Sequence, residues 1–226
     1  MNGMITTNEN FDIDHILDQI KNYKVVGVVE KVSCKERLTY KPGDLGTDGS
    51  INKEFQVAVL DVGSKNNIIR CLLERGCEVM VYPALSLAED ILSSTPDGIM
   101  ITNGPGDPAE CTSIIDEIKK LYGSNIPIFA ICLGHQLMAL ANGAKTQKMK
   151  YGHRGANHPV KDLSKDRVYI STQNHGYVVV EGSIATKVAK TSFVNVNDGT
   201  VEGLQYLGKN IFTVQFHPEA SSRSEE

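Results

Sequence analysis

The feature that most constrains the fold is a regular alternation of short apolar runs and helix-patterned segments between residues 55 and 143. Short apolar runs bounded by turn residues are typical of buried strands, and apolar residues three and four apart are typical of helices. Ser86 is the expected N-cap of the second helix. The alternation predicts an α/β fold, a mostly parallel open sheet flanked by helices. The strands are expected in FQVAVLDVG, CEVMVYP, DGIMITNGPG and IPIFAI, and the helices in NNIIRCLLERG, SLAEDILSST, TSIIDEIKKLYG and HQLMALAN.

The pattern changes on either side of this region. Residues 1–50 hold one helical pattern, FDIDHILDQIKNY, with Asp12 or Asp14 as its N-cap, followed by VVGVVEKVSC, a short strand or packing segment, and then a turn-rich stretch. We therefore expect residues 1–50 to be separate from a domain of residues 51–226. Additional β-strands are expected in the C-terminal half, around RVYIST, YVVV, TKVAK, VEGLQYL and NIFTVQF.

The composition excludes several classes of protein. Hydrophobic residues make up 41% of the 226 residues, enough for a buried core, and the net charge of -4 does not indicate nucleic-acid binding. No apolar run approaches a membrane span and the N-terminus lacks a signal-peptide pattern, so we expect a cytoplasmic protein. The five cysteines form no CxxC pair, which argues against a disulfide framework or a zinc site.

One cysteine occupies a distinctive position. Cys132 lies in FAICLGHQLMALA, between an expected strand and an expected helix. A tight strand-to-helix turn exposes a nucleophile at the carboxyl edge of the sheet, and it needs small neighbours, which Ala130 and Gly134 supply. The helix N-terminus favours a thiolate, and the Leu133 N–H is a candidate oxyanion donor. The alternative is an ordinary buried cysteine of the core.

A thiol nucleophile needs a base, and NIFTVQFHPEAS offers one. His217 ends an apolar strand, and Glu219 follows two residues later on the same face of an extended chain. A carboxylate beside an imidazole fixes its tautomer and raises its basicity. The alternative is a surface histidine at a strand exit. His217 can meet Cys132 only through the fold.

A third segment, TNGPGDP, follows another expected strand. Its glycines and proline predict a rigid turn with exposed N–H groups, so the Gly106 N–H is a candidate second oxyanion donor. An ordinary strand-exit turn is the alternative. The chain contains no phosphate-binding GxxxxGK[ST] loop, and His153 and His158 lie in an expected glycine-rich loop with no evident third metal ligand. We therefore expect no metal.

Taken together, CLGHQ, NGPGDP and FHPE resemble the class I (triad) glutamine amidotransferases, which have a flavodoxin-like fold. Within them, DGIMITNGPGDPAEC, AKTQKMKYGHRGANHPVKDL and TQNHGY are most similar to the glutaminase domain of carbamoyl-phosphate synthetase small subunits. The resemblance covers about residues 55–221. Residues 1–50 resemble the end of that subunit's N-terminal domain plus its linker.

The resemblance implies a role for each matching residue. Cys132 would be the nucleophile, His217 the base and acid, and Glu219 its orienting partner, with the N–H groups of Gly106 and Leu133 as the oxyanion hole. Residues that would bind substrate L-glutamine are Gly104, Gly106, Leu133, Gln136, Asn174, Gly176 and Tyr177. His135 and His175 are expected to be structural.

The resemblance also implies a partner. Ammonia would pass to the carbamoyl-phosphate synthetase large subunit, where ATP is expected. No cofactor is expected in this chain, and neither a nucleic acid nor a membrane is an expected partner.

The chain departs from the family in several places. It has Ala130 where glycine is usual and Tyr177 where phenylalanine is usual. Most of the N-terminal domain, with a residue that helps to bind glutamine, is expected to be missing, and the family continues beyond EASSRSEE. Alternatives therefore stay open: a glutaminase serving another synthetase, a γ-glutamyl hydrolase, or a truncated docking module without activity.

Overall fold

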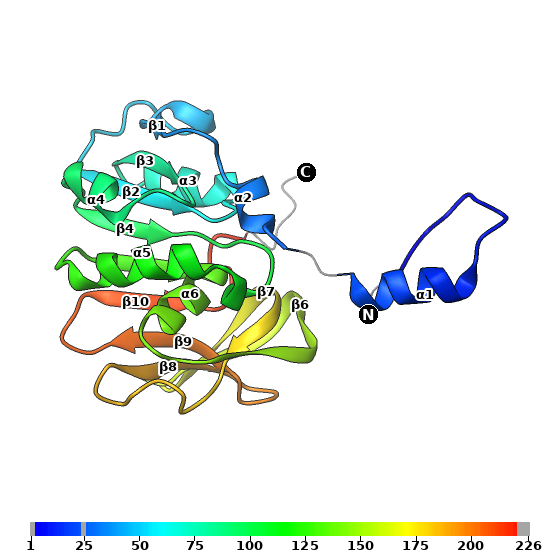
Figure 1. Ribbon diagram of the computed structural model, residues 1–226. Helices are drawn as coiled ribbons and strands as arrows, with labels where there is room; N and C mark the ends of the chain where they lie inside the picture. Colours follow the sequence, from blue (N-terminus) through cyan, green and yellow to red (C-terminus); the bar gives the residue numbers. More distant parts are fainter. Residues whose placement is uncertain (1–2, 24–25, 221–226) are drawn as a thin grey trace.

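The computed structural model describes residues 3–23 and 26–220, which contain one mixed ten-stranded sheet (Figure 1). The order across it is β1-β3-β2-β4-β5-β10-β9-β8-β6-β7. The strands are β1 (Leu38–Tyr40), β2 (Phe55–Asp61), β3 (Cys77–Pro83), β4 (Gly98–Ile101), β5 (Ile128–Ile131), β6 (Thr146–Asp162), β7 (Arg167–Val179), β8 (Ala189–Asn195), β9 (Val201–Tyr206) and β10 (Ile211–Val214). The helices are α1 (Ile13–Asn22), α2 (Val28–Val32), α3 (Asn66–Leu73), α4 (Ala88–Ser93), α5 (Thr112–Gly123) and α6 (Leu133–Ala141), with short 3-10 turns at Asp44–Gly46 and Pro108–Glu110.

The centre of the sheet is parallel. Strands β3, β2, β4, β5 and β10 pair side by side in parallel. Along the chain, one helix connects each of β2, β3, β4 and β5 to the next. This arrangement confirms the α/β fold with helices around an open sheet that the alternation predicts. Since all five strands point the same way, their carboxyl ends and the loops that follow them meet at one edge of the sheet.

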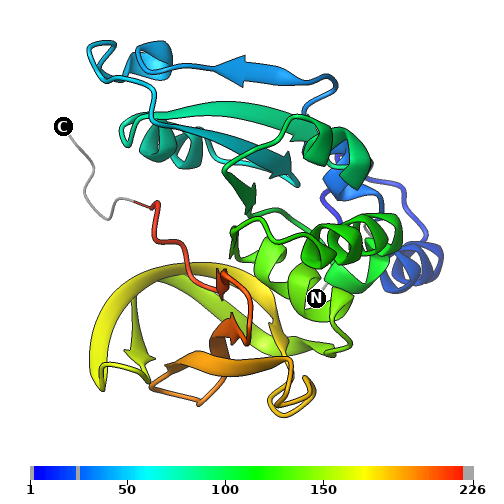
Figure 2. The same cartoon turned by 90° about the vertical axis from the view of Figure 1, so that its left-hand side faces the viewer.

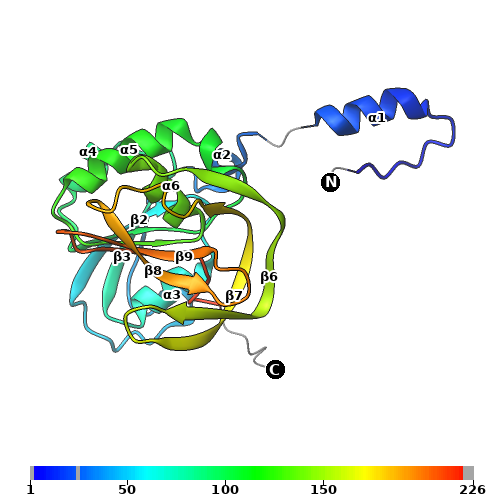
Figure 3. The ribbon, with the colours of Figure 1, turned by 90° about the horizontal axis from the view of Figure 1, so that it is seen from below.

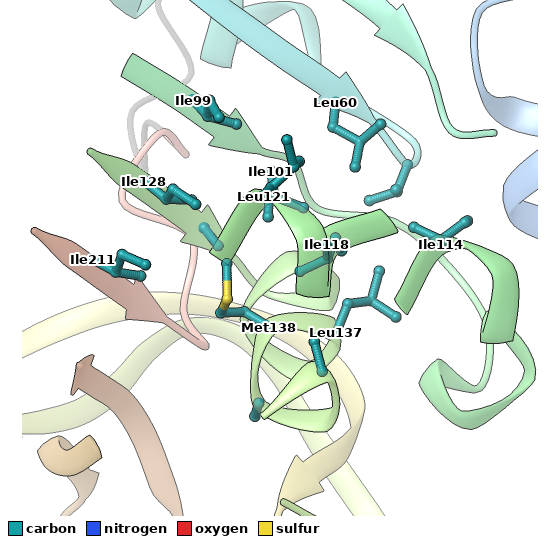
Figure 4. Packing of buried hydrophobic residues seen from close by; sticks show 14 of the residues in the cluster. Leu60, Ile99, Ile101, Ile114, Ile118, Leu121, Ile128, Leu137, Met138 and Ile211 are labelled. Atoms are coloured by element: carbon teal, nitrogen blue, oxygen red, sulfur yellow. The ribbon is translucent and has the colours of Figure 1, made fainter. Parts of the chain in front are cut away.

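Helices cover both faces of this parallel centre. On one face, α4, α5 and α6 pack on the side of β2 that carries Ala58 and Leu60, and on the other face α3 packs on the side that carries Val59. Each fully buried aliphatic side chain contributes about 1.5–3 kcal/mol. Figure 4 shows the larger core, in which side chains of α5 and α6 meet those of the sheet, among them Leu60, Ile99, Ile101, Ile114, Ile118, Leu121, Ile128, Leu137, Met138 and Ile211.

The C-terminal half adds further β-strands, as predicted, but their lengths differ from the sequence pattern. The structure shows that β6, β7, β8 and β9 pair antiparallel. Figure 2 shows β6 and β7 as a long curved hairpin. RVYIST and the first three residues of YVVV belong to the single strand β7. The prediction of a loop at GHRGANHP is wrong, because these residues lie within β6. Two register shifts, with Gly152 at φ +74° and Gly155 at φ +136°, let a glycine-rich segment remain paired.

The N-terminal region contributes to the domain in part. Helix α1 begins after Asp12, whose side chain caps it as predicted, and the helix lies apart from the sheet (Figures 1 and 3). Helix α2 replaces the strand considered for VVGVVEKVSC, and its buried Val29 fits the packing alternative. Strand β1 pairs antiparallel with β3. The division of the chain at residue 50 stays a prediction. Within the described residues no helix has the length and apolar character of a membrane span.

Candidate active site

The tight turn predicted at Cys132 is present. Strand β5 ends at Ile131, α6 begins at Leu133, and Cys132 between them has φ 53° and ψ -103°. A non-glycine residue at positive φ costs about 1–3 kcal/mol and persists only where its surroundings impose it. Here the Cys132 N–H donates to Val214 O at 2.8 Å. The strained turn holds the sulfur at the carboxyl edge of the sheet.

Gly134 shows why small residues are needed beside the cysteine. A Cβ built on Gly134 would lie 2.5 Å from Ile101 O. The Gly134 N–H donates to Thr102 O at 3.1 Å. The start of α6 therefore lies directly against β4. Ala130, where the resembling family has glycine, is completely buried and its methyl group is accommodated in the core.

His217 and Glu219 form a buried pair. Nδ1 of His217 lies 2.8 Å from Oε1 of Glu219, and both side chains are almost fully buried. Since Nδ1–H donates to the carboxylate, Nε2 carries the lone pair, and it has no hydrogen-bond partner among the described residues. The His217 N–H donates to Thr172 O of β7 at 2.9 Å, which fixes the segment after β10. The ring is oriented as a base requires.

Lys65 joins this pair, although no sequence motif pointed to it. Its Nζ lies 3.2 Å from Oε1 of Glu219 and 3.3 Å from Nδ1 of His217. Burial alone would raise the pKa of Glu219, but the hydrogen bond from His217 and the nearby charge of Lys65 outweigh it and lower that pKa. Glu219 is therefore ionised at neutral pH. Lys65 follows β2, so the rule that strand ends converge could have found it.

The Cys132 thiol is protonated in the free protein. Burial raises its pKa to about 12, opposed by the Leu133 N–H and the charge of Lys65, whereas the carboxylates of Glu219 and Glu202 add to the increase. The sequence-based expectation that the helix N-terminus favours a thiolate is thus outweighed by desolvation. A reaction at this sulfur needs a neighbouring base to take its proton.

These groups border one cleft of about 360 Å³. Leu133 lies outside the lining, but its N–H contacts the Cys132 sulfur, and Glu219 lies behind His217. Gly63, Lys65, Asn103, Pro105, Arg154 and His175 also line the cleft, beyond the predicted residues. The predicted residues that line it are Gly104, Gly106, Cys132, Gln136, Asn174, Gly176, Tyr177 and His217.

The turn after β4 borders the cleft with two glycines. Gly106 has φ +101° and open space where a Cβ would stand, whereas a Cβ on Gly104 would collide with Val62 O. Asn103 fixes this turn to the loop after β2 by donating from Nδ2 to Gly63 O at 3.1 Å. The backbone of Gly106 can therefore face a ligand in the cleft, as the predicted oxyanion donor must.

The opposite wall comes from β7. Gln136 of α6 donates from Nε2 to Tyr177 O at 2.7 Å and to Gln215 Oε1 at 2.9 Å. Both amide hydrogens are thereby used, which leaves Oε1 to accept a hydrogen bond from a ligand. Burial, then the hydrogen bond with Asp107, raises the pKa of Tyr177. The hydroxyl that distinguishes Tyr177 from phenylalanine thus links this wall to the turn after β4.

One group of possible metal ligands occurs in the described part of the chain, His153, His175 and Glu202, with ligand atoms within 4.8 Å of one another. Both ring nitrogens of His175 contact protein oxygens, of Tyr177 and Gln173, and His153 contacts Asp198. Burial lowers the pKa of His175 to about 4, so this ring is neutral and carries one N–H, which donates from Nδ1 to Tyr177 O. The charges lie on His153 and on the carboxylates that it contacts, so the geometry favours a charge cluster of His153, Asp198 and Glu202.

The fold and the site together define a class of protein: α/β proteins with a nucleophilic cysteine. The cysteine lies on a strained strand-to-helix turn, at a cleft that a buried His–Glu pair also borders. Comparison identifies the family: the model of the glutamine amidotransferase class-I family matches residues 58–226. The chain belongs to this family.

Individual proteins are similar to different extents. The carbamoyl phosphate synthase small chain of Vibrio vulnificus is 41% identical over 97% of this chain and 60% of that protein, and that of Bacillus cereus is 44% identical over 97% and 57%. The chain therefore spans about three fifths of the length of these relatives. A glutamine amidotransferase structure from Thermotoga maritima, 18% identical, has the same fold, with a TM-score of 0.59 over 74% of this chain and 77% of that one.

Proposed function

We propose that the chain hydrolyses L-glutamine to glutamate and ammonia through a thioester on Cys132. The observation that carries the proposal is the strained Cys132 turn at a cleft that His217 also lines, with Glu219 behind the imidazole. The cleft volume of about 360 Å³ is within the range of small-molecule sites.

The first half-reaction forms the thioester. As His217 Nε2 takes the thiol proton, the Cys132 sulfur attacks the side-chain carboxamide carbon of glutamine. The negative charge that develops on the carboxamide oxygen is stabilised by the N–H groups of Gly106 and Leu133, each worth about 3 kcal/mol in comparable sites. The carbon–nitrogen bond then breaks, and the nitrogen leaves as ammonia with the proton that His217 carries.

The second half-reaction restores the enzyme. His217 takes a proton from water, whose oxygen attacks the thioester carbon, and the carbon–sulfur bond breaks. The sulfur regains its proton from His217, and glutamate leaves. Glu219 holds the imidazole in one tautomer and stabilises its charged form in both halves. Asn174, Gly176 and Tyr177 bind the amino-acid end of the substrate, and Gln136 contacts it from α6.

The larger role is supported by the relatives named carbamoyl phosphate synthase small chain. In this proposal the ammonia passes to a carbamoyl-phosphate synthetase large subunit, which binds ATP and makes carbamoyl phosphate. The present chain then needs no cofactor of its own, and the glutaminase operates in the cytoplasm.

Labelling with an electrophilic glutamine analogue tests the proposal. We expect one tag, on Cys132 after peptide mapping, and protection from labelling by free glutamine. Cys132→Ala should remove the tag and lower glutamine-dependent ammonia release by at least about 10³-fold. Cys111→Ala is the matched control, since this half-buried thiol lies outside the cleft lining.

Four results would contradict the proposal. A tag elsewhere, or ammonia release by the Cys132→Ala variant equal to that of the parent, would exclude the assigned nucleophile. A preference for γ-glutamyl peptides over free glutamine would indicate a γ-glutamyl hydrolase. Docking to the large subunit without any labelling would indicate a binding module.

A further inference from the structure

A charge cluster with a buried centre, His153 and Glu202, and an exposed member, Asp198, lies behind the cleft wall that carries residues 174–177. His153 of β6 has its Nε2 2.8 Å from Asp198 Oδ2 and its Nδ1 3.3 Å from Glu202 Oε1. Glu202 is fully buried and His153 is 8% exposed. Contact with Glu202, then with Asp198, raises the pKa of His153 to about 9 against the effect of burial. His153 therefore supplies the positive charge that a buried carboxylate requires.

Both carboxylates are held by the β8–β9 hairpin. Asp198 Oδ1 accepts hydrogen bonds from the Thr200 N–H at 3.1 Å and hydroxyl at 2.8 Å. Glu202 Oε1 accepts from Asn195 Nδ2 at 3.2 Å. Backbone pairs between β6 and β8 run from residue 160 to residue 162, some distance from His153. The His153 side chain thus ties the far part of the β6–β7 hairpin to β8–β9.

From His153 the contacts continue into the wall of the cleft. His153 pairs with His175 across the β6–β7 ladder, and their rings meet edge to face at 4.9 Å. His175 Nδ1–H donates to Tyr177 O at 2.9 Å, the same oxygen that accepts from Gln136 Nε2. Register shifts of the ladder lie on either side of this pair. Such irregular pairing leaves the local geometry to side-chain contacts.

We propose that His153, clamped between Asp198 and Glu202, is a positioning residue that fixes His175 and, through it, the backbone wall that binds the amino-acid end of glutamine. The substrate in this statement rests on the proposed function, whereas the clamp does not. His153 makes no contact with the reacting atoms. Its loss leaves the charge of Glu202 buried without its partner and loosens the support of the wall.

Kinetics of His153→Gln test the effect on the substrate. KM for glutamine should rise about tenfold while kcat stays within about threefold, because binding is weakened and the reacting groups are untouched. Adding Glu202→Gln to His153→Gln should restore most of the affinity, since an amide pair replaces the unpaired charge. His158→Gln is the matched control, because its half-buried ring contacts that of His153 at 5.1 Å on the same strand. An unchanged KM in His153→Gln, or a double variant no better than the single, overturns the proposal.

Amide hydrogen exchange gives a readout that does not depend on activity. In His153→Gln, exchange of the peptide containing residues 174–177 should accelerate about tenfold, while exchange in β2 stays unchanged. Asp198→Asn, a milder change at a more exposed carboxylate, should give the same pattern at smaller amplitude. Equal acceleration in β2, or none at 174–177, overturns the proposal. If the parent chain does not hydrolyse glutamine, the proposed function fails, but the exchange result still decides about the clamp.

Discussion

The cleft has two sides that the sheet builds in different ways. Lys65, Gly106, Cys132 and His217 follow the parallel strands β2, β4, β5 and β10, respectively. The facing residues, Arg154 and 174–177, belong to the antiparallel hairpin β6–β7. Every proposed reacting group is thus on the parallel side, and the proposed support for the substrate's amino-acid end is on the antiparallel side.

The two sides also differ in what makes them rigid. On the parallel side, backbone packs directly against backbone: at Gly134 there is no room for even a Cβ beside Ile101 O. On the antiparallel side, register shifts interrupt the ladder, and side-chain contacts such as that of His153 with Glu202 hold the strands. Changes on the parallel side should therefore act on kcat or on folding, and changes on the antiparallel side on KM.

The largest expected effect is at the base. His217→Ala should lower kcat by at least about 10⁴-fold, and Glu219→Gln should lower it about ten- to a hundredfold less, because an orienting partner matters less than the base itself. Single-turnover ammonia release measures both. KM should change little, because neither side chain belongs to the amino-acid-binding wall. Equal losses in kcat would mean that Glu219 does more than orient His217.

Gly134→Ala should come next. Its Cβ would lie 2.5 Å from Ile101 O, so β4 or α6 must shift. We expect the free energy of unfolding to fall by about 2–3 kcal/mol in urea titrations. Gly123→Ala, at the end of α5 with nothing within 4 Å of the new Cβ, is the control and should change stability by less than about 1 kcal/mol. Comparable losses in both variants would contradict the tight contact between β4 and α6.

The parallel side was largely predictable from the sequence because its physics is local. Buried parallel strands are continuous apolar runs, and the loops that follow them converge, so the sequence alone places Cys132 and Gly106 at one edge of the sheet. Capping shows the limit of local patterns. Ser86 was the expected N-cap of α4, but the helix starts at Ala88, whose N–H donates to Glu117 Oε2 of α5 at 2.7 Å. A cap from another helix has no signal in the local sequence.

The antiparallel side was predicted less well. GHRGANHP has the composition of a loop, yet pairing with β7 makes it part of a strand. The charge cluster was not predicted either, because His153 meets Asp198 and Glu202 only after two hairpins pack together. The residues 174, 176 and 177 were assigned to the site by resemblance to a family, since their spacing alone carried no chemical pattern.

The charge cluster predicts a pH dependence of stability. The folded pKa of His153, about 9, lies above its ordinary value of 6.5, so its stabilisation is complete below pH 6.5 and is lost as the pH rises through 9. Relative to the double variant His153→Gln with Glu202→Gln, the parent should lose on the order of 2 kcal/mol of unfolding free energy across that window. Urea titrations at several pH values measure it. A constant difference would mean that His153 is not charged in the folded protein.

The smallest effect is expected at Lys65, and it tests whether the parallel side acts through charge or through packing. The Lys65 side chain is 45% exposed, so solvent screens its attraction to Glu219. Lys65→Met should lower kcat/KM by only about two- to fivefold, and the difference should shrink as salt rises from about 0.05 to 0.5 M. Lys65→Arg keeps the charge and should retain most of the activity. A loss beyond about a hundredfold, insensitive to salt, would instead mean that Lys65 touches the substrate, since a screened ion pair cannot supply that much. In that case the loop after β2 would bind substrate, and the division of labour between the two sides of the cleft would have to be redrawn.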